Sequence, residues 1–346
     1  MDYTLFILKK KDLISFSLRQ TFRSAMINQN KPAKGNRCMD RWGEKRYHSV
    51  DYDLKQLFGE KIYKITLNGR MTCPNRDGTV GYGGCIFCSA RGSGDFAGSA
   101  ALSITEQLKL GKQELLAKRP VSKYIAYFQA FTNTYAPVEY LEKIFREAIA
   151  DPDVVILSVA TRPDCLGRDV LDLLERLNHI KPVWIELGLQ TIHEETASFI
   201  RRGYRLPVFE DAVKELRMRK ITVIVHTIIG LPKETHAMML QTLDYLNACD
   251  IQGIKFQLLH VLKGTDLAAV YADTPFPLPS MVEYISFLTE CIARLRPDIA
   301  IHRLTGDGPK ELHIAPLWSE NKRTILNTLH RQLKEQDIWQ GKDYHD

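Results

Sequence analysis

The chain has 346 residues, of which 45% are apolar and 25% are charged, with a formal net charge of +6. The length suits one large α/β domain or two ordinary domains, and the composition is that of a globular protein. No apolar run reaches the roughly 20 residues that span a bilayer, and seven cysteines, an odd number, argue against a secreted disulfide framework. We therefore expect a cytoplasmic protein with free thiols and no membrane association.

The basic charge lies in the N-terminal segment. Residues 1–50 carry eleven Lys or Arg and four acids, so the remainder of the chain has a net charge of −1. Net charge alone therefore does not indicate nucleic-acid binding. Three interpretations of residues 1–40 compete: a disordered basic arm, an organelle presequence, and translation from an early start codon. Asp2 and Asp12 argue against a presequence. We favour a non-folded extension, with Met39 as the true start, and then a lead-in helix over 41–60.

From residue 61 onward, short apolar and β-branched runs alternate with helical stretches. Six runs have the length of strands and a weaker seventh follows: 62–67, 124–128, 154–159, 183–189, 221–228 and 254–259, then 299–304. Near-continuous apolar strands between amphipathic helices predict a parallel sheet covered by helices, in the α/β class. We expect a partial (β/α)6 TIM-type barrel over 61–270, with a short C-terminal extension over 271–346 packing on it.

A polar, glycine-bearing or otherwise turn-rich segment follows each predicted strand. These segments are 71–90, 129–133, 161–165, 188–191, 230–232 and 262–265. The C-terminal ends of parallel strands lie on one side of a barrel, so the segments should converge there. That side is the expected functional face.

The first of these segments holds three cysteines. Cys73, Cys85 and Cys88 have the spacing C-x11-C-x2-C in a turn-rich, glycine-rich stretch. A C-x2-C pair with a third thiolate suits an iron–sulfur cubane with one open iron. It also suits a zinc knuckle completed by a histidine such as His48. The spacing leaves both alternatives open, and we favour the cluster.

No fourth cysteine ligand is evident in the sequence. Cys38 lies in the N-terminal extension, and Cys249 and Cys291 lie in helical patterns, where small core residues are expected. Three thiolates on a four-iron cluster would leave one iron free to bind a cofactor or substrate. That open position is why the cysteine loop points to catalysis rather than to structural metal binding.

The cysteine loop and six further stretches resemble the radical S-adenosylmethionine (SAM) superfamily, in its Elp3-like branch and the bacterial YhcC/YtqA-like family. The stretches are LFGEKIYKITLNGRMTCPNRDGTVGYGGCIFCSARGSGDFAG (57–98), YFQAFTNTY (127–135), TRPDCL (161–166), ELGLQT (186–191), VHTIIGLPKET (225–235), LLHVLKGT (258–265) and APLW (315–318). The resemblance covers about residues 41–335. The eleven-residue gap departs from the commoner C-x3-C-x2-C spacing, as the Elp3-like branch generally does.

The resemblance implies a radical mechanism. Cys73, Cys85 and Cys88 would bind a [4Fe–4S] cluster whose open iron takes the amino and carboxylate groups of SAM. An electron from a donor such as flavodoxin or ferredoxin would allow reductive cleavage of SAM to methionine and a 5′-deoxyadenosyl radical. The cofactors supply this chemistry, and the protein supplies position and a dry site.

The resemblance also implies contacts to SAM. The expected cofactor-binding residues are Gln129, Glu186, Gln190, Arg202, Gly230 and Pro232. Arg202 matches an arginine that binds the SAM carboxylate, with a solvated helix end as the alternative. Gln190 matches a ribose contact, and Gln129 is one replacement for an absent glycine pair that receives the SAM amino group. Glu186 lies in a strand pattern and must be paired if it is buried. His226 stands where relatives often carry an acid.

The expected substrate rests on analogy with Elp3, which attaches a carbon to C5 of the wobble uridine of tRNA. We expect a related alteration of a wobble-uridine side chain, without an acetyltransferase domain, because residues 305–346 are too few for one. Basic residues of a C-terminal helix over 319–334 could meet phosphate, or form an ordinary solvated face. The alternatives are a small-molecule radical SAM enzyme and a zinc-stabilised, non-catalytic nucleotide-binding barrel. No obligate protein partner is expected.

Overall fold

The computed structural model describes residues 42–92 and 94–345. The expected N-terminal extension, with Cys38 and Met39, lies outside the described residues. Among the helices that are described, none is long and apolar enough to cross a membrane.

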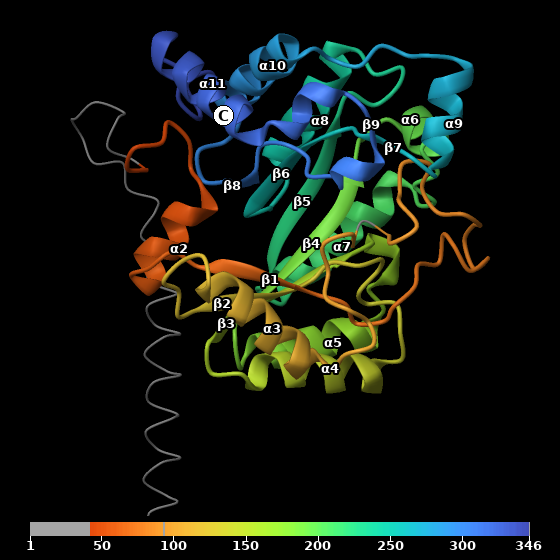
Figure 1. The fold of residues 1–346 in the computed structure, drawn as a ribbon, viewed down its shortest axis with the longest axis vertical. Coiled ribbons are helices and arrows are strands. Elements are labelled where there is room, and N and C mark those ends of the chain that lie inside the picture. Colours follow the sequence, from red (N-terminus) through yellow and green to blue (C-terminus); the bar gives the residue numbers. More distant parts are fainter. Residues whose placement is uncertain (1–41, 93, 346) are drawn as a thin grey trace, which may run out of the picture.

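Seven parallel strands form one sheet, which curls into a half-barrel with β1 and β8 as its edges (Figure 1). In sheet order the strands are β1 (Tyr63–Leu67), β2 (Tyr124–Phe128), β3 (Val154–Thr161), β4 (Val183–Gln190), β5 (Thr222–Ile229), β6 (Gly253–Leu258) and β8 (Ala300–Arg303). All six expected strands are present, and the weaker seventh run forms β8. The α/β partial barrel is confirmed, with one strand more than the six of the expected repeat.

Helices cover the outer face of the sheet (Figure 1). They are α3 (Ile104–Leu116), α4 (Val138–Ala150), α5 (Arg168–Asn178), α7 (Leu206–Met218), α8 (His236–Ala248) and α10 (Met281–Arg294). Capping boxes begin α3, at Ser103 and Glu106, and α10, at Ser280 and Glu283. The apolar stripes of these helices pack against the outward side chains of the strands, and this layer is the main hydrophobic core.

The remaining elements lie at the two ends of the half-barrel. They are α2 (Val50–Phe58), α6 (Glu194–Phe199), β7 (Val261–Leu262), α9 (Asp266–Asp273), β9 (His313–Ala315) and α11 (Lys322–Glu335), with 3-10 turns at Pro163–Cys165, Lys310–Leu312 and Leu317–Glu320. The lead-in helix is shorter than expected over 41–60, because Ser49 bridges to Ile301 in an extended conformation and caps the helix that follows. On α11, Ile325, Leu329 and Leu333 are buried, so the helix packs through one apolar face.

The inner face of the half-barrel is built in layers. The lowest layer is apolar and is covered by Leu54 of α2; its members are Ile62, Ile125, Ile156, Trp184 and Ile224. Strand side chains alternate between faces, so the inward residues two positions further along form the next layer. That layer is polar: Lys64, Tyr127, Ser158, Glu186, His226 and Lys255. The apolar layer closes the bottom of the half-barrel, and the polar layer faces the functional end.

The C-terminal residues tie the seventh strand into the sheet. Gln340 is fully buried; its side-chain carbonyl accepts from the His48 N–H at 2.8 Å, and its amide donates to the Arg296 and Ile299 carbonyls at 2.9 Å each. These bonds fix the chain just before β8 and just before α2. One glutamine thereby links three segments that are distant in sequence.

Replacing Gln340 with Ala should lower the free energy of unfolding by about 2–3 kcal/mol, because the His48 N–H and the Ile299 carbonyl lose their partner, while the Arg296 carbonyl keeps the Ile299 N–H. The matched control is Gln336→Ala, an exposed glutamine of the same segment, for which we expect a change within about 0.5 kcal/mol. Denaturant unfolding of the anaerobically prepared protein measures both. Equal stability of the two variants would contradict the assigned role of Gln340.

Candidate functional site

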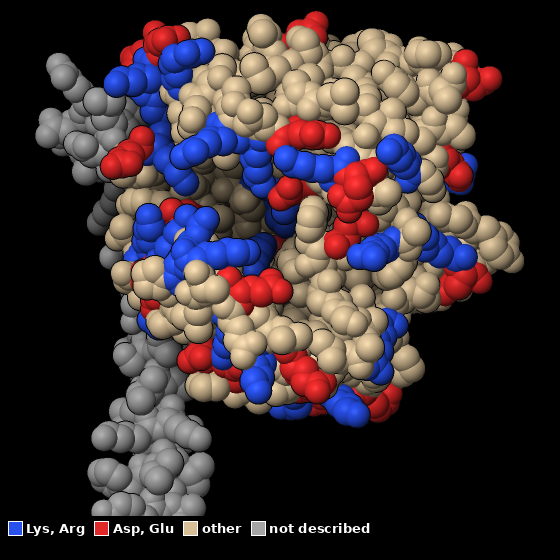
Figure 2. Space-filling view, viewed as in Figure 1, with Lys and Arg blue, Asp and Glu red and all other residues tan. Residues whose placement is uncertain are grey.

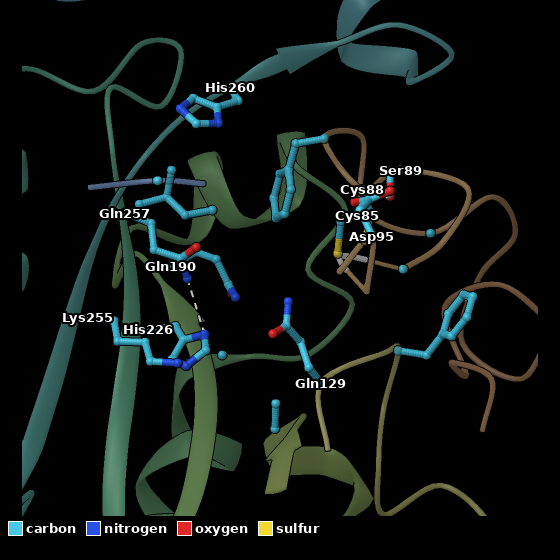
Figure 3. Close-up of a pocket in the computed structure, with 18 of the residues that line it drawn as sticks. Cys85, Cys88, Ser89, Asp95, Gln129, Gln190, His226, Lys255, Gln257 and His260 are labelled. Atoms are coloured by element: carbon cyan, nitrogen blue, oxygen red, sulfur yellow. Dashed lines mark hydrogen bonds between the residues drawn. The ribbon is translucent and has the colours of Figure 1, made fainter. Parts of the chain in front are cut away.

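A cavity of about 250 Å³ lies at the C-terminal ends of the strands. One wall is the cysteine loop, with Cys85 and Cys88. The opposite wall is formed by His226 of β5 and Lys255 of β6, with Gln129 between the two walls (Figure 3). Five of the six segments that the sequence placed after the strands therefore contribute to one site, and only 230–232 does not line it.

The long gap between the first two cysteines folds into a compact hairpin. Asp77 pairs with Tyr82 in an antiparallel bridge, and the Val80 N–H donates to the Pro74 carbonyl at 2.8 Å. Gly84 has φ +85°, and a Cβ there would lie 2.9 Å from Nε of Arg76, so glycine is required at this position. The hairpin returns the chain to its starting point, which places Cys85 and Cys88 beside Cys73.

Backbone bonds anchor the cysteine loop to the rest of the fold. The Ile86 N–H donates to the carbonyl of Ile200, just after α6, and the Ile86 carbonyl accepts from the Leu267 N–H of α9. Arg76 donates to the Ser89 carbonyl at 2.6 Å, and Asp95 accepts from the Ser89 hydroxyl at 3.0 Å. The thiols thus sit on a turn held from several sides.

The three thiols suit a centre that carries positive charge. Burial, together with the neighbouring Cys88 and Cys73, raises the pKa of the Cys85 thiol to about 12, against an opposing effect of Arg162. Three neighbouring thiolates repel one another unless a cation lies between them. A polynuclear iron centre meets that need, because each thiolate then binds a different iron.

A single zinc ion fits this site less well. Within the described residues, no three His, Cys, Asp or Glu side chains are grouped closely enough to hold one metal ion. His48, the suggested fourth zinc ligand, is buried at the other end of the half-barrel, beside Ile301. Its ring nitrogens lie 2.7 Å from a carboxylate oxygen of Asp53 and 3.2 Å from the carbonyl oxygen of Pro297. His48 is therefore not placed to complete a zinc knuckle.

Glu186 is the centre of the polar layer beneath the cavity. Its buried carboxylate accepts from Lys64 at 2.6 Å, from Ser158 at 2.8 Å, from His226 at 2.7 Å and also from Lys255. Burial alone would raise the pKa of this carboxyl, but the Lys255 and Lys64 ammonium groups outweigh burial and hold the pKa well below its usual range. One ionised carboxylate therefore connects β1, β3, β4, β5 and β6.

His226 lies between this carboxylate and the cavity. Its Nε2–H donates to Glu186, which leaves Nδ1 to accept from the Gln257 amide at 3.2 Å (Figure 3). Burial, together with the Lys255 ammonium, lowers the pKa of the imidazole to about 4 despite the neighbouring carboxylate. At neutral pH His226 is therefore uncharged, with both ring nitrogens paired.

Comparison with known proteins identifies the family. The radical SAM superfamily model matches residues 74–246, and the radical SAM C-terminal domain model matches 251–335. The chain is 46% identical over 299 residues to the uncharacterized protein YtqA of Bacillus subtilis, covering 86% of this chain and 93% of that protein. It is 38% identical over 287 residues to YhcC of Escherichia coli, covering 83% and 92%. This chain belongs to the radical SAM superfamily, in its Elp3-like YhcC/YtqA family.

One further relative and one solved structure of similar fold carry informative names. A tRNA uridine(34) acetyltransferase of Dehalococcoides mccartyi is 25% identical over 188 residues, which are 51% of this chain and 39% of that protein. The solved structure of Elp3 from Methanocaldococcus infernus superposes with a TM-score of 0.62 at 15% identity. That likeness covers 81% of this chain and 64% of that chain, and it shows a shared fold.

Members of the radical SAM superfamily generally use SAM and a [4Fe–4S] cluster. Among the residues expected to contact SAM, Gln129, Glu186, Gln190 and Arg202 all line the cavity of this chain. Gly230 and Pro232 are not among the lining residues: Gly230 turns the chain at the end of β5 against Pro279, and Pro232 is buried. The structure thus brings together four of the six residues.

Arg202 is more constrained than a surface arginine. It is 1% exposed and donates to the Leu189, Thr191 and Tyr204 carbonyls, while Glu194 lies 3.3 Å away. These bonds exclude the solvated helix end that was the alternative. They also use most of its N–H donors to hold the turn after β4, so any contact from Arg202 to SAM would be limited to the remaining donor.

Sequence reasoning missed the cationic side chains inside the half-barrel. Lys64, Lys255 and Arg303 lie within strands that read as apolar, and Lys255 is only 3% exposed. For Lys64, the signal that could have found it is the two-residue period of the inner face, because 64, 186 and 226 each lie two positions beyond a residue of the lowest layer. To assign residues of different strands to one layer, the pairing register of the strands must be known, and the sequence alone does not provide it.

His226 predicts a dependence of stability on pH. Its pKa is about 4 in the folded protein and about 6.5 in an unfolded chain, so between these values the unfolded state takes up a proton that the folded state does not. The stability that comes from keeping His226 neutral in the folded protein is fully present above pH 6.5 and is lost as the pH falls toward 4. The free energy of unfolding should fall from pH 7 to pH 5 in the unaltered protein. In His226→Asn we expect this fall to be smaller by about 1–2 kcal/mol, because the titrating imidazole is absent.

Urea unfolding at the two pH values measures this difference. The control is His236→Asn on α8, where the side chain is 57% exposed. We expect the control to follow the unaltered protein. A common pH dependence of all three proteins would contradict the assigned protonation state of His226.

Proposed function

We propose that this radical SAM enzyme holds a [4Fe–4S] cluster on Cys73, Cys85 and Cys88, uses it to cleave SAM reductively, and acts on the side chain of the wobble uridine of tRNA. The observation that carries the first two parts is the convergence of three thiols on one wall of a cavity whose other wall is polar. The action on tRNA is supported by the similarity to a tRNA uridine(34) acetyltransferase and to Elp3.

The bound cofactors would supply the radical chemistry: an electron passed to the SAM sulfonium gives methionine and a 5′-deoxyadenosyl radical that takes a hydrogen atom from the substrate. The chain itself would position and shield these groups. Gln129 and Gln190 offer amide donors and acceptors to the polar parts of SAM. Phe87 and Phe131 line the same cavity and limit the access of water. A reducing partner such as flavodoxin or ferredoxin would deliver the electron.

Support for tRNA comes from two directions. A relative is named a tRNA uridine(34) acetyltransferase, and the fold is that of an Elp3. In addition, Lys and Arg side chains flank a hollow between the two edge strands β1 and β8 (Figure 2). On α11, Arg323, Arg331 and Lys334 are exposed. Cations of this kind can bind phosphates without reading sequence.

Cysteine variants test the cluster. Cys85→Ala or Cys88→Ala should lose most of the bound iron and all reductive SAM cleavage, because two thiolates do not retain a cubane firmly. The control is Cys249→Ala at the end of α8, which should keep its iron and its brown colour. Iron content and 5′-deoxyadenosine formation under reducing, anaerobic conditions measure both effects. A fully iron-loaded, active Cys85→Ala protein would overturn the assignment.

Nucleoside composition tests the substrate. Bulk tRNA from a strain lacking this gene should show an altered wobble uridine by mass spectrometry, and the intact gene should restore it. The Cys88→Ala gene is the matched control and should fail to restore it while still producing protein. An unchanged nucleoside profile would refute the tRNA assignment and favour a small-molecule substrate.

A further inference from the structure

Arg303 is a half-buried cation with no partner among the described residues. It ends β8 and lines the cavity, and no hydrogen bond or ion pair of its guanidinium is found with residues 42–92 or 94–345. It lies close enough to Tyr127, His226 and Lys255 to affect their ionisation. A guanidinium held away from bulk water normally has an acceptor, because leaving its charge uncompensated is costly.

The acids near the cavity do not compensate Arg303. Glu186 already accepts from two lysines, Lys64 and Lys255. Asp95 accepts from Ser89 within the cysteine loop, and Asp307 forms an ion pair with Lys322 at 3.0 Å. The wall of the cavity formed by β6 and β8 therefore carries an excess of positive charge.

Further donors lie beside Arg303 in the segment that follows β8. Gly306 and Gly308 line the cavity, and their N–H groups have no acceptor within the part of the chain that is described. His260 also lines the cavity, and its buried Nε2 has no partner there. A Cβ at Gly306 would lie 2.7 Å from Cε1 of His260, so this glycine allows the loop to approach the ring.

We propose that Arg303, His260 and the backbone of Gly306 and Gly308 form a subsite for an oxyanion of the substrate, a carboxylate or a phosphate. Guanidinium groups and free backbone N–H groups are the donors that suit such anions. Figure 3 places His260 across the cavity from the cysteines, so a substrate anchored there would extend toward the cluster. This inference rests on the proposed function, since it names the chemical class of the substrate.

Anion titrations test the subsite. The probes are inorganic phosphate and acetate, added to the anaerobic, cluster-containing protein at constant ionic strength and followed by isothermal titration calorimetry. We expect saturable binding of at least one probe, weakened about tenfold or more by Arg303→Gln because a charged hydrogen-bond donor is lost. Phosphate binding alone would indicate a phosphate group, and acetate binding alone a carboxylate.

Two variants serve as controls. Arg176→Gln removes the same charge from α5, where the side chain is 53% exposed, and should bind like the unaltered protein. Arg303→Lys keeps the charge and should bind with intermediate affinity, which keeps the test informative if Arg303→Gln does not fold. Binding that is equal in the unaltered and Arg303→Gln proteins, or no saturable binding of either probe, would overturn the proposal.

A SAM titration separates this proposal from the other assignments. If Arg303→Gln weakened SAM as much as it weakened phosphate or acetate, the anion would be the SAM carboxylate, and the substrate subsite would be wrong. If the unaltered protein lacked an iron cluster but still bound the anion through Arg303, the proposed radical function would fail while the anion site stood. The SAM titration thus tests the substrate subsite, and the iron content tests the radical function.

Discussion

The buried carboxylate of Glu186 is the interaction on which the rest of the site depends. Glu186 is 1% exposed and is held by two ammonium groups, an imidazole and a hydroxyl that come from four other strands. Placing these charges inside a half-barrel is costly unless every partner is present. The network is therefore cooperative, and it fixes the register of the inner side chains directly beneath the cavity. Apolar side chains below it exclude water from the closed end of the half-barrel.

The cysteine loop supplies the other wall by a different principle. It is held by backbone hydrogen bonds, by a compact hairpin and by Ile86, which is buried in a small apolar cluster with Ile200 and Leu267. The anchors at Ile200 and Leu267 come from segments after β4 and after β6. The loop begins at the end of the edge strand β1 and is attached to segments that follow strands further along the sheet. These anchors explain how a chain with an eleven-residue gap can place all three cysteines on one wall of the cavity.

The sequence was sufficient to predict the fold but only part of the candidate site. The alternation of apolar strands and helices gave all seven strands, because each period is a local property of the chain. Cys73, Cys85 and Cys88 were identifiable from their spacing. The network around Glu186 was not, because Lys64 and Lys255 reach this carboxylate only when separate strands lie in register. Gly230 and Pro232 matched a family motif, yet the structure places them outside the cavity.

Together, the two walls define a polar cavity in which the three cysteines face a cationic surface. Electron paramagnetic resonance of the reduced protein, recorded with and without SAM, tests this account most directly. It predicts the signal of a reduced [4Fe–4S] cluster whose g values change when SAM is added, because SAM would bind the iron that no cysteine occupies. A cluster signal that SAM leaves unchanged, or the absence of any iron–sulfur signal in fully reconstituted protein, would contradict it.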